Sequence, residues 1–227
     1  MRMPACFPVF RLLCRFGFVV TLAAVAYGQT STPTQVTDSS ALHPPAGARV
    51  AIVEFDDLEC PACAAANPQL KAAAAQYKIP WVRHDFLIPV HMWSRQAAIN
   101  ARWFDAKSKA LGDEYRDQVF ANQVSIYNAG VLSEFTAKFA QAHGVSLPFS
   151  LDPQGKLAAE VEADNALAIK SGMKHTPTVF IVTNSKSEPY IEVLNVAQQL
   201  FTDIDRGMAA STPIAPPKAA MKKASAH

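Results

Sequence analysis

The sequence predicts an α/β fold in which a block of helices interrupts a small β-sheet. Three observations predict this fold class. A β-α-β pattern occupies residues 49–88, apolar residues at helical spacing fill residues 91–171, and a β-β-α pattern follows at residues 178–206. The chain has 227 residues, of which 50% are hydrophobic, and this is enough apolar material for one sizeable core.

The first unit begins at residues 49–55, which are short and rich in β-branched side chains and therefore predict a strand. The Ala-rich segment 61–77 is helical by propensity, and Pro68 predicts a kink within it. A second strand is expected at residues 81–88. Because a helix connects these two strands, they are expected to be parallel, with a right-handed crossover.

The helical block at residues 91–171 divides into four helices by its apolar periodicity. The third is expected to end at Gly144, a typical residue just beyond a helix. Asp152 and Pro153 are expected to open the fourth as its N-cap and first helical residue, and Gly172 to end it.

The last unit contains two runs of β-branched and aromatic residues, 178–182 and 190–193, which are spaced as a β-hairpin. A final helix is expected at about residues 196–206.

Two segments outside these elements lack hydrophobic periodicity. Residues 27–44 are rich in Ser, Thr and Pro and predict a flexible linker, and residues 208–227 predict a disordered tail. The folded domain is therefore expected at residues 45–207.

Residues 1–26 are predicted to be a cleaved signal peptide. Arg2, Arg11 and Arg15 supply the positive charge, and the apolar run 16–26 ends in small residues that a signal peptidase accepts. That run has 11 residues, which is short for a membrane span. A retained N-terminal anchor is the competing interpretation. With either interpretation the domain is expected to be exported.

The charge of the chain argues against one class of partner. The formal net charge is +2, but residues 45–207 contain 15 Lys and Arg against 18 Asp and Glu. The predicted domain has no basic stripe, so nucleic acid is not expected as its main partner.

The number and spacing of the cysteines limit the kinds of site that the chain could contain. Of four cysteines, Cys6 and Cys14 lie in the predicted signal peptide, which leaves Cys60 and Cys63 as one close pair. In an oxidising compartment such a pair fits a redox dithiol, and it fits a small structural disulfide equally well. Zinc would need two further ligands, but the histidines are scattered singly. No metal, flavin or nucleotide motif appears, so the dithiol is the only redox group we expect.

The position of the pair favours redox chemistry. Cys60-Pro61-Ala62-Cys63 lies where a strand ends and a helix begins, so the helix N-terminus favours a thiolate at Cys60. In such motifs the pKa of the first cysteine lies at roughly 3.5 to 7.5. Cys63, one turn further in, is expected to stay protonated. Cys60 would then attack or be attacked, and Cys63 would resolve the mixed disulfide.

Two motifs resemble a known family. Residues 54–63, Glu-Phe-Asp-Asp-Leu-Glu-Cys-Pro-Ala-Cys, resemble the strand-turn-helix of DsbA-like thioredoxin-fold proteins. Residues 172–180 resemble their cis-proline loop, and the helical block at 91–171 is similar to their inserted helical domain. The resemblance covers about residues 45–207. It implies a thioredoxin fold with an inserted helical domain and catalysed dithiol–disulfide exchange with protein clients in the periplasm.

The resemblance also implies roles for particular residues. Cys60 is the expected nucleophile and Cys63 the resolving thiol. Pro177, joined to Thr176 by an expected cis bond, would pack beside the dithiol and contact bound peptide. The expected peptide-binding set is completed by Pro61, Ala62 and His175. Cysteine-containing exported proteins are the implied clients, and a membrane-bound or soluble redox partner would reset the Cys60–Cys63 disulfide, with no other cofactor.

Four carboxylates precede the dithiol. Glu54 lies in an apolar strand, where a carboxylate is costly without a partner or a function. The matching acid of the family relays a proton to or from the resolving thiol, and the alternative is a strand-edge glutamate that faces water. Asp56, Asp57 and Glu59 are expected in a solvated turn that caps the helix, although they would oppose thiolate formation if they faced the sulfur.

Several alternatives stay open. His175 either faces the dithiol or is an ordinary loop residue, and Thr176 occupies a position that influences redox behaviour in related folds. Oxidase, reductase and isomerase activities are all compatible with the sequence. So is a non-catalytic peptide-binding module in which Cys60–Cys63 is an inert disulfide.

Overall fold

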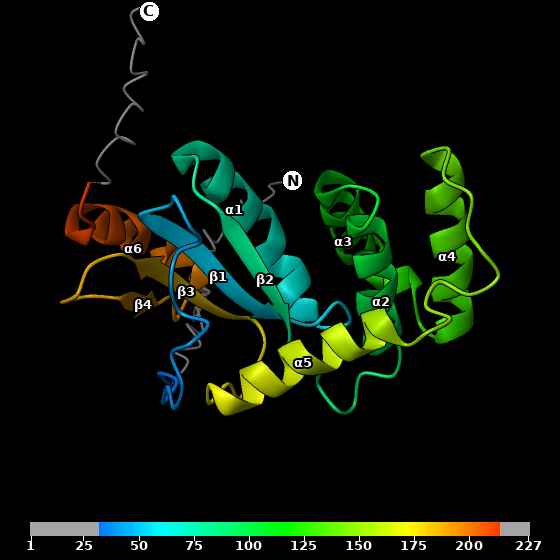
Figure 1. Cartoon of the computed structure of the whole chain (residues 1–227), viewed down its shortest axis with the longest axis horizontal. Coiled ribbons are helices and arrows are strands. Elements are labelled where there is room, and N and C mark those ends of the chain that lie inside the picture. The colour runs from blue at the N-terminus through cyan, green and yellow to red at the C-terminus, as the bar shows by residue number, and fades with distance from the viewer. Residues whose placement is uncertain (1–31, 214–227) are drawn as a thin grey trace, which may run out of the picture.

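The computed structural model describes residues 32–213, which contain one mixed β-sheet (Figure 1). Its strands are β1 (Val50–Asp56), β2 (Trp81–Asp85), β3 (Thr178–Thr183) and β4 (Tyr190–Glu192). The strand order is β2-β1-β3-β4. β1 and β2 are parallel, as the β-α-β pattern predicts, whereas β1–β3 and β3–β4 are antiparallel.

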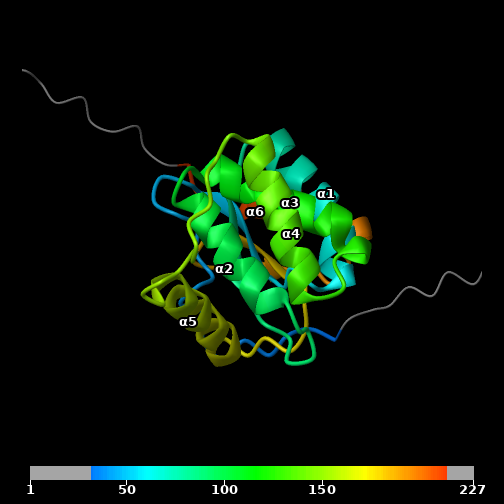
Figure 2. The ribbon, with the colours of Figure 1, turned by 90° about the vertical axis from the view of Figure 1, so that its right-hand side faces the viewer.

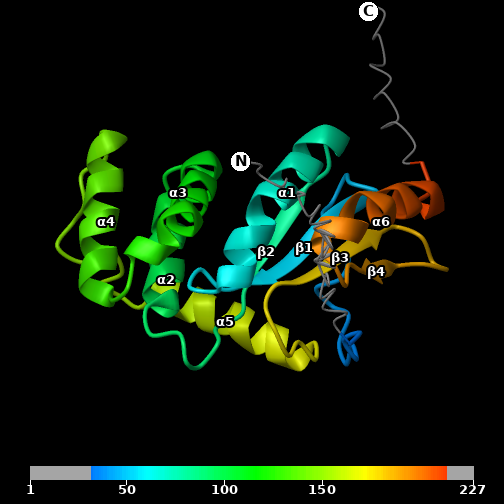
Figure 3. The ribbon, with the colours of Figure 1, turned by 180° about the vertical axis from the view of Figure 1, so that it is seen from behind.

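Helices cover the sheet and extend beyond one end of it. They are α1 (Pro61–Tyr77), α2 (Ser94–Asp105), α3 (Lys109–Asn122), the short 3₁₀ helix η1 (Gln123–Ser125), α4 (Ala129–Ala142), α5 (Lys156–Lys170) and α6 (Val196–Ala210). α1 and α6 lie on one side of the sheet and α5 on the other (Figures 1 and 3). The predicted fold class, a thioredoxin fold with an inserted helical domain, is confirmed.

The two faces of β1 follow the alternation of side chains along a strand. Val50 and Ile52 pack against α1 and α6, whereas Ala51, Val53 and Phe55 pack toward α5. All of them are buried, so the central strand is apolar on both faces apart from the polar residues at its end. Those polar residues lie beside the start of α1.

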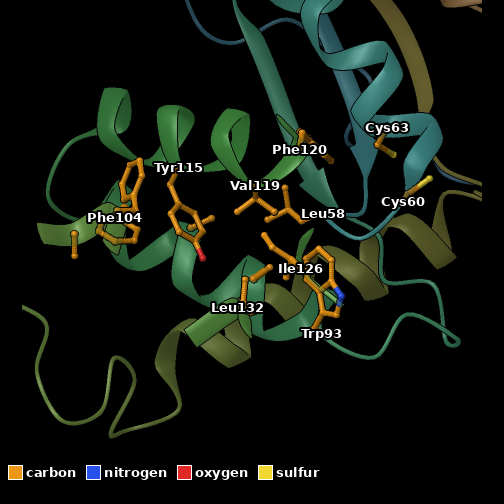
Figure 4. Close-up of a cluster of buried hydrophobic side chains, with 14 residues drawn as sticks. Leu58, Cys60, Cys63, Trp93, Phe104, Tyr115, Val119, Phe120, Ile126 and Leu132 are labelled. Atoms are coloured by element: carbon orange, nitrogen blue, oxygen red, sulfur yellow. The ribbon is translucent and has the colours of Figure 1, made fainter. Parts of the chain in front are cut away.

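The inserted helices have a core of their own. Figure 2 shows α2, α3 and α4 together at one end of the molecule. Aromatic rings of Phe104, Tyr115 and Phe139 pack in this core, with centroids 4.8 to 5.2 Å apart. The same buried cluster continues to Cys60 and Cys63 (Figure 4). The insertion and the dithiol therefore belong to one packed unit.

Three predicted boundaries are wrong. β2 ends at Asp85, not at residue 88, because the backbone N–H of Ile88 turns to the carboxylate of Asp57 instead of a strand neighbour. α5 begins at Lys156, after Gly155 in the left-handed region, although Asp152 still caps it by accepting two N–H groups of its first turn. α6 continues to Ala210, beyond its predicted end at residue 206.

The segment expected as a flexible linker is in contact with the domain where it is described. Residues 32–44 form no helix or strand, but Leu42 is buried and Thr37 donates its backbone N–H to the Ser171 carbonyl at 3.1 Å. Gly172, with φ +89°, permits this contact, because a Cβ there would lie 2.4 Å from the backbone oxygen of Gln35. Part of the segment expected as a flexible linker at residues 27–44 is thus held against the domain.

The predicted signal peptide lies outside the described residues, as does the predicted tail from residue 214 onward. Within residues 32–213, no helix is long and apolar enough to span a bilayer.

Candidate active site

Cys60 and Cys63 lie where β1 passes into α1. Cys60 is the N-cap residue of α1, with extended backbone (φ −79°, ψ 119°), and Pro61 occupies the first helical turn, where its missing N–H leaves no bond unmade. Cys60 is 7% exposed and Cys63 is fully buried, and both are free thiols. Figure 4 shows both sulfur atoms at the start of this helix. The strand-to-helix position expected from the sequence is confirmed.

The two thiols are shifted in opposite directions. A hydrogen bond from the Cys63 thiol is the largest cause that lowers the pKa of Cys60 to about 5, and the backbone N–H groups of Ala62 and Cys63 add to it. Burial is the largest cause that raises the pKa of Cys63 well above its ordinary value. At neutral pH Cys60 is therefore a thiolate and Cys63 a thiol, which is the division needed for nucleophilic attack followed by resolution.

The cis-proline loop lies beside the dithiol. The Thr176–Pro177 peptide bond is cis, as expected. The Cys60 sulfur lies 3.4 Å from the Thr176 carbonyl oxygen, to which the protonated thiol donates a hydrogen bond. Segments more than a hundred residues apart in the sequence thus meet at the reactive sulfur.

A groove of about 510 Å³ runs along this loop. Ala62, His175, Thr176 and Pro177 contribute to its lining, together with residues 192–197, from the end of β4 to the start of α6. Pro61 is exposed at the surface beside Ala62 but does not line the groove. The structure therefore brings together four of the five residues that were expected to contact peptide.

His175 is held by its own loop. Its ring Nδ1 lies 3.4 Å from the Thr178 hydroxyl, and its Nε2 is buried without a hydrogen-bond partner. Among residues 32–213 no hydrogen bond joins His175 to either cysteine, so its contacts favour the alternative of an ordinary loop residue.

Glu54 is buried beneath the dithiol, with 1% of its surface exposed. Trp81 donates its indole N–H to Glu54 Oε2 at 3.0 Å, and Arg83 Nε lies 3.9 Å from the same oxygen. Burial, followed by the charge of Asp56, raises the pKa of Glu54 to about 8. The alternative of a strand-edge glutamate that faces water is wrong, because both neighbouring strands are paired with β1.

The expected solvated turn at Asp56, Asp57 and Glu59 is also wrong. Asp56 and Asp57 are 2% and 1% exposed. Asp57 accepts the backbone N–H groups of Glu59 and Ile88, both at 2.8 Å. Its Oδ2 also lies 3.0 Å from Nδ1 of His91, a residue in the loop before α2. Asp57 thus fixes the turn that leads into α1.

Glu59 caps a different helix from the one expected. Its Oε2 accepts the backbone N–H groups of Trp93 and Ser94, at 2.6 and 3.0 Å, at the start of α2. The carboxylate stabilises the N-terminus of α2 and directs its charge away from Cys60. This helps to explain how the pKa of Cys60 can be lowered although acidic residues directly precede it in the sequence.

Sequence analysis missed two kinds of group that support the site: a glutamine that holds the active-site turn, and two side chains of β2 that contact or approach Glu54. Gln123 in η1 donates its amide N–H to the carbonyl oxygens of Leu58 and Cys60, at 2.9 and 3.1 Å. No local pattern marks a glutamine that reaches the active-site turn across 63 residues. Trp81 and Arg83 could have been found from the sequence. In a parallel strand beside β1, alternate residues lie on the same face of the sheet as Glu54.

No group of three or more His, Cys, Asp or Glu residues is placed to hold a metal ion in the part of the chain from residue 32 to 213.

We expect the reactivity of Cys60 in the reduced protein to rise with pH through about 5, because alkylation requires the thiolate. In Cys63→Ala the donated hydrogen bond is lost, so the midpoint should move to higher pH. Cys63→Ser retains a donor and should show a smaller shift. The rate of alkylation by iodoacetamide as a function of pH measures each midpoint. Equal midpoints in all three proteins would contradict this cause of the low pKa.

Known proteins share this architecture. A family model described as thioredoxin (Thioredoxin_4) matches residues 45–190. No curated protein sequence matches the chain. Among solved structures, alpha-DsbA1 of Wolbachia pipientis is 17% identical, with 74% of this chain and 90% of that chain covered at a TM-score of 0.59.

Two further structures agree. DsbA2 of Pseudomonas aeruginosa is 20% identical over 72% of this chain and 91% of its own, with a TM-score of 0.54. Oxidised BdbD of Bacillus subtilis is 18% identical over 78% of this chain and 95% of its own, with a TM-score of 0.59. At these identities the likeness shows a common fold, and the family match covers more than half of the sequence. The chain therefore belongs to the thioredoxin family, and its fold is that of DsbA-like proteins.

Proposed function

We propose that this protein is a thiol:disulfide oxidoreductase that exchanges disulfides with cysteine-containing exported proteins through Cys60 and Cys63. One observation carries the proposal. A cysteine with a pKa of about 5 lies at a helix N-terminus beside a cis-proline loop, one turn from a fully buried thiol. The family match and the DsbA-like fold support the same activity.

The exchange has two steps. With the protein oxidised, a client thiolate attacks Cys60 Sγ; the Cys60–Cys63 bond breaks, and its electron pair goes to Cys63, which takes a proton. A second client thiolate then attacks the client sulfur of the mixed disulfide, and Cys60 leaves as a stable thiolate. Two electrons pass from the client to the protein. Run in reverse, the same steps reduce or rearrange a client disulfide.

Other residues take supporting roles in this proposal. Glu54 holds a proton near neutral pH and supplies it to Cys63 or receives it back. The groove along Ala62, His175, Thr176 and Pro177 binds an extended peptide segment of the client, and exposed Pro61 meets the client at its rim. The predicted signal peptide places this reaction in the periplasm, where a membrane-bound or soluble partner resets the dithiol.

The activity is tested with purified protein lacking residues 1–26. The oxidised form should transfer its disulfide to reduced, unfolded ribonuclease, and the reduced form should cleave insulin disulfides, whereas Cys60→Ser should do neither. Wild-type protein that behaves like Cys60→Ser in both assays would reject the proposal in favour of an inert disulfide in a peptide-binding module.

The direction of electron flow follows from the reduction potential of the Cys60–Cys63 couple. A value near −270 mV, roughly that of thioredoxin, favours reduction of particular clients, and one nearer −120 mV favours oxidation. Stabilisation of the Cys60 thiolate stabilises the reduced form, so we propose oxidation as the main direction.

A further inference from the structure

Two carboxyl groups, not one, are buried on the face of β1 that points toward α1. Glu54 and Asp56 are two residues apart and share that face with Val50 and Ile52. They are 1% and 2% exposed, and each has one buried oxygen without a hydrogen-bond partner, Glu54 Oε1 and Asp56 Oδ2. Two charged carboxylates on one buried strand face oppose each other's ionisation, and this favours a state in which the pair retains a proton.

Two arginines lie near the pair, and in the described part of the chain neither forms a hydrogen bond with it. Arg116 on α3 forms a bidentate ion pair with Asp105, at 3.0 and 2.6 Å. Arg83 on β2 donates to Asn67, lies 3.5 Å from Asp117 and only approaches Glu54, at 3.9 Å, and its Nε and Nη1 are buried without a hydrogen-bond partner. Among residues 32–213 no ion pair reaches Asp56, so these arginines act on it only through space.

Two other acids near Asp56 have hydrogen-bond donors of their own. Asp85, its partner in the β1–β2 register, accepts hydrogen bonds from Arg102 at 2.8 and 2.6 Å. Asp57 accepts two backbone N–H groups. The charges of Asp85 and Asp57 each contribute to raising the pKa of Asp56.

The proton affinities agree with this arrangement. Burial is the main cause that raises the pKa of Asp56 to about 7, against the opposing charge of Arg83. After burial, the charge of Asp56 is the next cause that raises the pKa of Glu54. Asp56 and Glu54 also contribute, after burial and the hydrogen bond with Cys60, to the raised pKa of Cys63.

We propose that Asp56 shares a proton with Glu54, and that this buried pair, rather than Glu54 alone, supplies the proton taken up at Cys63 when the disulfide opens. The inference rests on the proposed function. As the sulfur–sulfur bond breaks, the electron pair goes to Cys63 and the proton moves to it from the pair. The pair gains one negative charge and later regains a proton from solvent. Either carboxyl of the pair can hold the proton that moves to Cys63.

The test is the rate at which a small thiolate opens the oxidised disulfide, measured against pH and corrected for ionisation of the reagent. In the unaltered protein this rate should fall as the pair loses its proton. In Asp56→Asn, Glu54 no longer faces a second negative charge and loses its proton more easily. The pH at which the rate has fallen by half should therefore be lower by about one unit. The rates at pH 5 should be equal in both proteins, because Glu54 is protonated in each.

Further variants separate a pair from a single acid. If the two carboxyls share the work, Glu54→Gln keeps a pH dependence that only Glu54→Gln with Asp56→Asn removes. If Glu54→Gln alone abolishes the dependence, the proposal is wrong. Asp113→Asn, the same chemical change on the surface of α3, is the control and should leave the profile unchanged. A loss of rate in Asp56→Asn that is uniform across pH would indicate a structural role and reject the pair.

A second measurement needs no substitution. Carbon NMR of the carboxyl groups in the unaltered protein should show Asp56 and Glu54 titrating together near neutral pH, and titration of Asp56 in the ordinary acid range would overturn the proposal. Failure here is distinguishable from failure of the proposed function, which would appear as no disulfide exchange by the unaltered protein.

Discussion

Reduced Cys63→Ser protein is expected to accumulate as a covalent mixed disulfide with clients that contain a disulfide. The Cys60 thiolate attacks the client bond, and one client sulfur leaves as a thiolate. In the unaltered protein Cys63 then attacks Cys60 Sγ and releases the client. Serine retains a hydrogen-bond donor near Cys60 but cannot complete this second step. The complex should persist until an external thiol is added.

Cys60→Ser is the matched control, because it also leaves one cysteine in the dithiol. The remaining Cys63 is fully buried, and burial raises its pKa well above the ordinary value, whereas the pKa of Cys60 in the unaltered protein is about 5. At pH 6 Cys63→Ser should therefore hold much more of its remaining cysteine as thiolate than Cys60→Ser does. Non-reducing gels and intact mass measure the adduct. Equal trapping by both variants would contradict the assignment of Cys60 as the attacking residue.

The parts of the fold that depend on local pattern could be predicted from the sequence. Sequence analysis found β1 from its β-branched residues, α1 from its alanines and the inserted helices from their apolar periodicity. These elements depend on residues that are close together in the sequence. The cis bond before Pro177 was expected from a motif. The predicted end of β2 was wrong, because it depends on a tertiary hydrogen bond. The N–H of Ile88 donates to the Asp57 carboxylate, and no residue near β2 in the sequence indicates this bond.

The environment of the acidic residues could not be predicted for a related reason. Asp56, Asp57 and Glu59 are of a residue type that usually faces water, so a solvated turn was the natural expectation. Each instead meets a partner or a burying surface contributed by a distant segment. For Glu59 that partner is the start of α2, more than thirty residues further along the chain. Burial of a carboxylate is a property of the assembled fold, and it decides whether the group caps a helix or holds a proton.

Arg102 supports the position of the inserted helices on the sheet. From α2 it donates two hydrogen bonds to Asp85 at the end of β2, at 2.8 and 2.6 Å, and one to Asp164 on α5 at 2.5 Å. Burial raises the pKa of Asp85, and the charge of Arg102 is the main opposing cause. The arginine thus permits Asp85 to remain ionised in a buried position.

Arg102→Met is therefore expected to lower the free energy of unfolding at pH 7 by about 3–5 kcal/mol, because it leaves a buried carboxylate without its cation. Arg95→Met, on the same helix, removes an ion pair with Glu162 in which both side chains are about half exposed, and should cost about 0–1 kcal/mol. Urea denaturation of the oxidised proteins measures both values.

The pH dependence distinguishes the lost charge pair from lost packing. Without Arg102 the pKa of Asp85 rises further in the folded state, and a carboxyl whose pKa is raised by folding favours the folded state more at low pH than at high pH. The deficit of Arg102→Met should therefore shrink as the pH is lowered toward 4, because Asp85 then takes up a proton and no longer needs a cation. A deficit that stays constant with pH would mean that the methylene stem of Arg102, and not its charge, holds α2 to the end of β2.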